Sequence, residues 1–92
     1  MKVKELLSDE SKWCQGPIAR SLSGRSVSYN NPNAVCWCLW GALHKCYPDE
    51  NQFLTVRRKV KRYIRGDFVT DWNEDRRRTF AEVKALVEEL DI

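Results

Sequence analysis

The sequence predicts a single α+β domain over residues 1–92, mostly helical, in which three main helices pack with a small antiparallel β-hairpin or three-stranded sheet. Three observations lead to this fold class. Apolar side chains recur at three- and four-residue steps over residues 32–45 and again over 51–65, as on one buried face of a helix. Residues 79–82 (TFAE) have the pattern of a helical capping box. Ser23-Gly24 separates two short segments with strand propensity, as in a β-hairpin.

In the first half of the chain, residues 2–7 predict a short helix, and residues 18–20 and 27–29 predict the two hairpin strands. Asn31 is placed to cap a helix, and Pro32 to occupy its first position, where the missing N–H costs nothing. We therefore expect a helix from Pro32 to about residue 45.

In the second half, Asp49 or Asn51 can cap a helix that ends near Arg65, with Gly66 as a left-handed terminator. Residues 68–72 have strand propensity and are expected to pair with the hairpin as a third strand. The helix that starts at the capping box completes the domain. The predicted core consists of Leu39, Leu43, Val56, Val60, Phe80, Val83 and Leu86.

Composition indicates a folded chain, since 42% of the residues are hydrophobic and four are tryptophan. No segment has the roughly 20 consecutive apolar residues that a membrane helix needs, and the N-terminus leads into no long apolar signal region. We therefore expect no membrane partner and a cytoplasmic location, where cysteines stay reduced.

The cysteines and the single histidine raise two chemical possibilities. Cys36, Cys38, His44 and Cys46 lie close in sequence, and Cys14 could join them in a zinc site. On the expected helix, Cys36 and Cys38 would point about 200° apart, so we predict no metal ion and no other cofactor. Cys36 and His44 would be roughly 12 Å apart, too far for a catalytic pair. A thiol-dependent enzyme that uses Cys14 or Cys38 with His44 stays open, and no catalytic residue is assigned.

The charges are distributed unevenly. Residues 57–65 carry lysines and arginines without any acid, whereas residues 82–91 carry four acids against one lysine. The basic helix face, together with the turn at Arg76-Arg77 and the loop at Trp72-Asn73, is the best candidate for a partner-binding surface. The predicted partner-binding residues are Arg58, Lys61, Arg62, Arg65, Trp72, Asn73, Arg76 and Arg77.

Structural explanations compete with both parts of this surface. A run of charges on an amphipathic helix is usually a solvated face, and Glu74, Asp75 and the acidic last helix could neutralise it. Trp72 and Asn73 could instead pin a loop, with the asparagine closing a turn through its own backbone.

Several short motifs occur in one order along nearly the whole chain: KWCQG at 12–16 with Ala19-Arg20, AVCWCLWGAL at 34–43, Trp72-Asn73, and Arg78-Thr79 with Glu82-Val83. In this order they resemble an uncharacterised family of small bacterial and phage proteins with W-x-Q-G, C-x-x-G-A-L and W-N followed by R-T-x-x-E-V. The chain departs from that pattern at Pro17-Ile18 and at Glu74, where aspartate is usual. The resemblance implies no reaction, but it implies a setting in which short phage proteins bind host proteins, including host defence complexes.

The first functional prediction is therefore a small phage or bacterial binding module that modulates or inhibits a host protein or protein–nucleic acid complex, such as a host defence system. It would act in the cytoplasm, which is that of the host if a phage encodes the chain. The alternatives are a nucleic-acid-binding protein that uses the basic helix at 51–65 and a small thiol-dependent enzyme.

Overall fold

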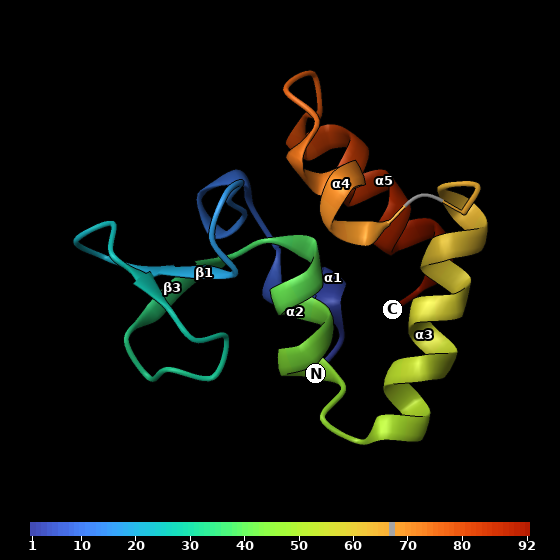
Figure 1. The fold of residues 1–92 in the computed structure, drawn as a ribbon, viewed down its shortest axis with the longest axis horizontal. Coiled ribbons are helices and arrows are strands. Elements are labelled where there is room, and N and C mark those ends of the chain that lie inside the picture. The colour runs from blue at the N-terminus through green and yellow to red at the C-terminus, as the bar shows by residue number, and fades with distance from the viewer. Residues whose placement is uncertain (67) are drawn as a thin grey trace.

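The computed structural model describes residues 1–66 and 68–92 and confirms an α+β domain that is mostly helical (Figure 1). The described elements are α1 (Val3–Leu6), the 3-10 helix η1 (Glu10–Lys12), β1 (Ala19–Ser21), β2 (Ser26–Val27), β3 (Ala34–Trp37), α2 (Leu39–Cys46), α3 (Glu50–Tyr63), α4 (Val69–Glu74) and α5 (Phe80–Leu90). No helix in the described part is both long and apolar enough to span a membrane.

The three strands form one antiparallel sheet in the order β2-β1-β3. The hairpin is confirmed: Ala19 lies opposite Val27, and Gly24 in the turn has a φ of 88°, which favours glycine. The third strand is not the predicted one, because β3 comes from residues 34–37 and pairs with β1. Figure 1 shows that this sheet projects to one side of the helices.

The predicted helix from Pro32 to residue 45 is therefore wrong over its first half, residues 32–38. Asn31 closes a turn instead of capping a helix, since its side chain accepts a hydrogen bond from the Asn33 amide at 2.8 Å and its carbonyl accepts one from the Ala34 amide at 3.0 Å. In the segment that follows, Ala34, Cys36 and Trp37 pair with β1, with an irregularity in the register next to Ala34. Helix α2 begins at Leu39, where the Sγ of Cys38 accepts a hydrogen bond from the Gly41 amide at 3.3 Å.

The predicted strand at residues 68–72 is wrong because most of this segment belongs to α4. Val69 and Asn73 are buried and Trp72 is half-buried, which is the one-turn spacing of a helix face. Phe68 lies outside this face, at the helix N-cap, and is 70% exposed. The strand propensity of this segment did not decide its structure, because its buried side chains follow the three- and four-residue spacing of a helix.

The two longest helices begin where the sequence predicted. Asp49 caps α3 by accepting a hydrogen bond from the Gln52 amide at 2.9 Å, and Thr79 and Glu82 form the predicted capping box of α5. Beyond α3, Arg65 and Gly66 both have positive φ, and the Gly66 amide donates to the Lys61 carbonyl at 2.7 Å.

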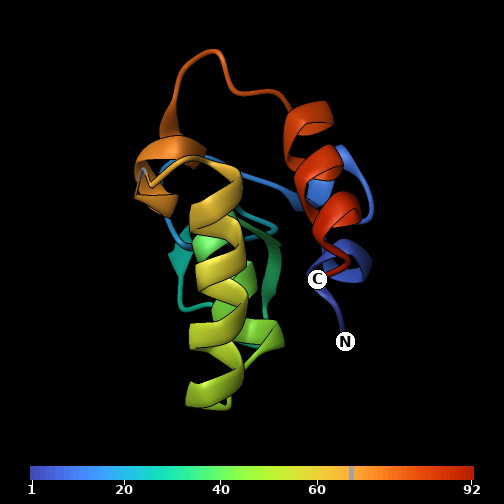
Figure 2. The same ribbon diagram turned by 90° about the vertical axis from the view of Figure 1, so that its right-hand side faces the viewer.

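The core lies between α2, α3 and α5, with α1 packed on α2 and α5 (Figure 2). Leu39, Leu43, Val56, Val60, Val83 and Leu86 are buried as predicted, whereas Phe80 is half-buried. Ile92, also buried, was not predicted to be a core residue; its carbonyl accepts a hydrogen bond from the Lys4 amide at 3.0 Å and so joins α1 to the end of α5.

Candidate partner-binding surface

The cationic side of α3 faces outward, as its amphipathic pattern predicts. On α3, Arg58 and Arg62 are exposed and Lys61 is half-buried, while Phe53, Val56 and Val60 on the other side are buried in the core. Arg65, which was predicted to end this helix, lies just beyond it and is also exposed. The helix therefore presents its basic residues to solvent.

Among residues 1–66 and 68–92, no acidic side chain forms an ion pair with a cation of α3. The acids of the last helix and its end pair elsewhere: Glu82 with Arg78 at 2.8 Å, Glu88 with Lys84 at 3.8 Å, and Asp91 with Lys2 and Lys4. The acidic C-terminal segment thus does not neutralise the basic helix face through these contacts.

Asp91 makes the stability of the fold depend on pH. Hydrogen bonds from Lys2 and Lys4 lower the pKa of the Asp91 carboxyl to about 2 from its usual value near 3.8. A carboxyl whose pKa is lowered in the folded state stabilises the fold above its unfolded pKa and loses that contribution as the pH falls toward 2. We therefore expect Asp91→Asn to flatten the fall in the free energy of unfolding between pH 5 and about 2, as followed by urea denaturation. The same flattening in the exposed control Glu89→Gln would contradict this assignment.

Asn73 lies in the interior and not on the surface. It has no exposed area, and its Oδ1 accepts hydrogen bonds from the indole Nε1 of Trp13 at 2.8 Å and from the Leu39 amide at 3.0 Å. Its Nδ2 donates to the Cys14 carbonyl at 3.3 Å and to Oε1 of Glu74 at 2.9 Å. With every polar atom of its side chain engaged, Asn73 holds the start of α2 and the segment at residues 13–14 against α4 and is not available to a partner.

The neighbouring residues extend this connection. The side-chain amide of Gln15 donates to the carbonyls of Asn73 and Asp75, both at 2.8 Å, and the Gly16 amide donates to Oε2 of Glu74. The motif at 13–16 and the motif at 72–74 are thus two halves of one hydrogen-bond network. Asn73 therefore has a structural role, but not the predicted one: it lies in α4 and bonds to segments distant in sequence instead of closing a turn through its own backbone.

Trp72 contacts Arg78 of the same chain through both its ring and its carbonyl. The guanidinium carbon of Arg78 lies 3.8 Å from the centroid of its ring, and Nε of Arg78 donates to the Trp72 carbonyl at 2.9 Å.

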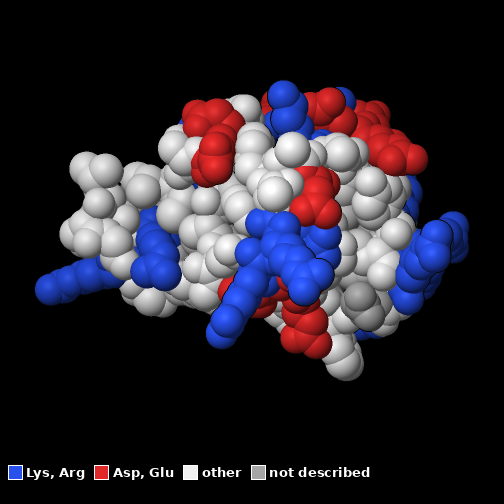
Figure 3. Space-filling view, turned by 90° about the horizontal axis from the view of Figure 1, so that it is seen from above, with Lys and Arg blue, Asp and Glu red and all other residues white. Residues whose placement is uncertain are grey.

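Arg76 and Arg77 are exposed on the turn between α4 and α5. Figure 3 shows the basic side chains of this face in separate groups, with acidic and uncharged atoms between them. The turn and α3 therefore do not form one continuous basic band on this face.

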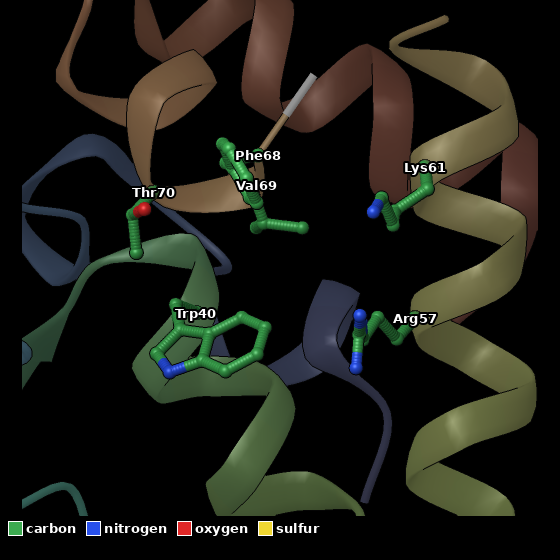
Figure 4. A pocket seen from close by; sticks show the side chains of 6 residues that line it. All are labelled: Trp40, Arg57, Lys61, Phe68, Val69 and Thr70. Atoms are coloured by element: carbon green, nitrogen blue, oxygen red, sulfur yellow. The ribbon is translucent and has the colours of Figure 1, made fainter. Parts of the chain in front are cut away.

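A groove adjoins the basic helix face, and we call it the α2–α3 groove. It has a volume of about 320 Å³ and is lined by Trp40, Arg57, Lys61, Phe68, Val69 and Thr70. Figure 4 shows Arg57 and Lys61 extending from α3 toward Trp40 on α2 and toward Phe68 and Val69. The Nζ of Lys61 is 5.6 Å from the centroid of the Phe68 ring. Apolar walls and two cations thus meet in one hollow.

Of the groove residues, sequence reasoning identified Lys61 but missed Trp40, Arg57 and Phe68 as parts of a site. The exposed aromatic Phe68 was assigned to a strand, which hid its position at the start of a helix. A signal was present, since Arg57 and Lys61 are four residues apart and so share one side of α3. Nothing local in the sequence brings α2 and residue 68 to that side.

On the far side of Trp40 and Arg57 lies a second hollow of about 430 Å³, which these two residues also line. Its wall is a cluster of stacked rings: His44 lies 4.2 Å from Phe53 and 5.3 Å from Tyr29 between ring centroids, and Trp40 meets His44 edge-on at 4.9 Å. Burial lowers the pKa of His44. The histidine is therefore a packing residue held between two aromatic rings.

The pKa values of Cys14, Cys38 and Cys46 are all raised. Burial, with a hydrogen bond to Cys36, raises the pKa of Cys14 to about 12, and burial raises that of Cys46 to about 11. The pKa of Cys38 is raised too, chiefly by burial. All four cysteines are free thiols. These shifts do not favour a cysteine nucleophile at neutral pH.

The geometric reason for discounting a metal was mistaken, because Cys36 lies on β3 and Cys38 caps α2, so the two do not share a helix. Within the described residues, no group of three or more His, Cys, Asp or Glu side chains is arranged to hold a metal ion.

Fold and site together define a small α+β domain with a basic helix beside an apolar groove. The chain belongs to a family of unknown function, DUF6197, whose family model matches residues 1–90. This finding confirms the resemblance to an uncharacterised domain family. No curated protein and no solved structure matches the chain.

Proposed function

We propose that the chain is a binding module that docks the exposed cations of α3 onto an acidic surface of a partner protein. In the bacterial or phage setting implied by the sequence motifs, that partner is a component of a host complex, such as a defence system, which the module modulates or inhibits. The observation that carries the proposal is the set of outward-facing cations on α3 without an ion-pair partner among the described acids.

Two further features support a protein partner. Oppositely charged surfaces speed up association and select partners, which suits a row of cations fixed on a well-capped helix. Stable interfaces also need an apolar centre, and the α2–α3 groove offers one directly beside these cations. The proposed surface keeps Arg58, Lys61, Arg62 and Arg65, while Asn73 is left out because it is buried.

The test is affinity capture from a bacterial lysate, followed by titration with the purified partner. The triple variant Arg58→Glu/Arg62→Glu/Arg65→Glu should weaken binding at least about tenfold, because it replaces attraction by repulsion at three exposed sites. The matched control reverses three exposed cations elsewhere, Lys12→Glu/Arg25→Glu/Lys84→Glu, and changes the net charge equally. Circular dichroism checks that both variants fold. Equal binding by the two variants, or no specific capture by the wild type, would contradict the proposal.

A nucleic acid is the second candidate, and one observation favours it: the 70% exposed ring of Phe68 lies beside Lys61, where a base could stack next to a phosphate contact. A mobility-shift assay with short single- and double-stranded DNA tests it. True phosphate contacts weaken steeply as salt rises, so the absence of a shift even at low salt rejects this candidate.

A further inference from the structure

We propose that the α2–α3 groove anchors a short acidic segment of the partner in which one bulky apolar side chain lies next to a carboxylate. The apolar side chain would enter the hollow between Trp40, Phe68 and Val69, and the carboxylate would meet Arg57 and Lys61. This inference rests on the proposed function and names the chemistry that the partner brings to it.

The size and walls of the groove suit a single side chain. Its volume of about 320 Å³ lies at the lower end of the range of roughly 300–1,000 Å³ for ligand pockets. Of the residues that line it, Val69 is buried, whereas Phe68 is 70% exposed. An apolar side chain placed there would cover part of a ring that otherwise stays in water, which favours binding.

The charge of the groove suits a carboxylate. Arg57 and Lys61 lie one turn apart on α3 and both line the groove. Neither forms an ion pair with an acid in the part of the chain that the structure describes. A guanidinium can donate two parallel hydrogen bonds to a carboxylate, and the apolar walls beside it exclude some of the competing water.

The second hollow favours a peptide over a nucleic-acid strand. It continues past Trp40 and Arg57, but Glu50 lines it and the side chains from α2 there are Trp40 and His44. A strand with a phosphate at every nucleotide would run from two cations toward a carboxylate. A peptide can place its acidic residue at Arg57 and Lys61 and a neutral or basic residue near Glu50. The charges that line the two hollows therefore also predict how the peptide is oriented, with its acidic residue at Arg57 and Lys61 and its neutral or basic residue near Glu50.

The experiment uses a library of random 12-residue peptides displayed on yeast and sorted against the whole wild-type chain. Enriched peptides should share an aspartate or glutamate within two positions of Phe, Trp or Leu. The strongest are then synthesised and titrated by fluorescence anisotropy. Phe68→Ser and, separately, Arg57→Glu/Lys61→Glu should each weaken binding about tenfold or more, because each removes one half of the anchor.

Matched controls keep the comparison specific. Leu22→Ser removes an apolar side chain that is 89% exposed on the hairpin, and Lys12→Glu/Arg25→Glu reverses two exposed cations outside the groove. Both should leave the peptide affinity within about twofold of the wild type. Because Phe68 is exposed, its replacement should leave the fold intact, which circular dichroism verifies.

The inference would be overturned if no peptides were enriched or if the enriched peptides lacked the acidic-apolar pattern. It would also be overturned if the groove variants bound the peptides as tightly as the wild type does. Tighter, groove-dependent binding of a ten-nucleotide oligo-thymidine would overturn it too, because it would assign the groove to nucleic acid. The outcome is separable from that of the proposed function. If partner capture is lost with the α3 triple variant but kept with Phe68→Ser, the module binds through α3 alone. If peptides bind in the groove but partner capture is unchanged in the α3 triple variant, the inference about the groove is supported and the proposed function is rejected.

Discussion

Replacing Asn73 with alanine should lower the free energy of unfolding by about 3 to 4 kcal/mol, as measured by urea denaturation. Asn73 is fully buried and makes four side-chain hydrogen bonds that reach Trp13, Cys14, Leu39 and Glu74. Its removal leaves the Leu39 amide at the start of α2 and the Trp13 indole without their acceptor in a site with little water. Leaving a buried donor unsatisfied costs about 1 to 3 kcal/mol for each group.

The control for this prediction is Asn33→Ala, which removes an exposed amide and should change the free energy of unfolding by less than about 0.5 kcal/mol. A loss below 1 kcal/mol in Asn73→Ala would show that the network is dispensable. It would also reopen the possibility that the asparagine serves a partner.

The second large effect is expected at Gly41. A Cβ on this residue would lie 2.4 Å from the Ile18 carbonyl oxygen and 2.7 Å from Cγ2 of Ile18. That carbonyl accepts a hydrogen bond from the Cys38 amide at 3.0 Å, so it cannot move away without weakening the contact between the segment before β1 and the start of α2. Gly41→Ala should therefore cost about 2 kcal/mol and lower the melting temperature by about 10 °C.

This result would oppose helix propensity, because alanine normally stabilises a helix by about 1 kcal/mol relative to glycine. Gln52→Ala in the first turn of α3 is exposed and should leave the melting temperature nearly unchanged. A melting temperature that rises in Gly41→Ala would mean that α2 and the segment before β1 do not pack as closely as the structure shows.

Local signals in the sequence were sufficient for elements that depend on their own caps and periodicity. Asp49, Thr79 and Glu82 mark the starts of α3 and α5, and Gly24 marks the hairpin turn. Each of these acts through backbone groups within a few residues, so the physical cause lies within the segment itself. The outward orientation of the α3 cations was predictable for the same reason.

The errors occurred where a distant segment decides the structure. Residues 34–37 pair with β1 as a strand, and the helix at 69–74 is held in place by hydrogen bonds from the Trp13 indole and the Leu39 amide to Asn73. Neither partner is close in sequence. The α2–α3 groove was missed for the same reason, since Trp40 and Phe68 are distant in sequence and line one hollow only in the folded chain.

We expect α3 and the groove beside it to form the surface that a partner covers. Amide chemical shifts of the labelled chain, followed during titration with the captured partner, report which residues are covered. The predicted result is that the perturbed amides concentrate in α3 and at Phe68–Thr70, with the hairpin of β1 and β2 unchanged. Perturbations that concentrate on that hairpin or on α5, with α3 unchanged, would contradict it.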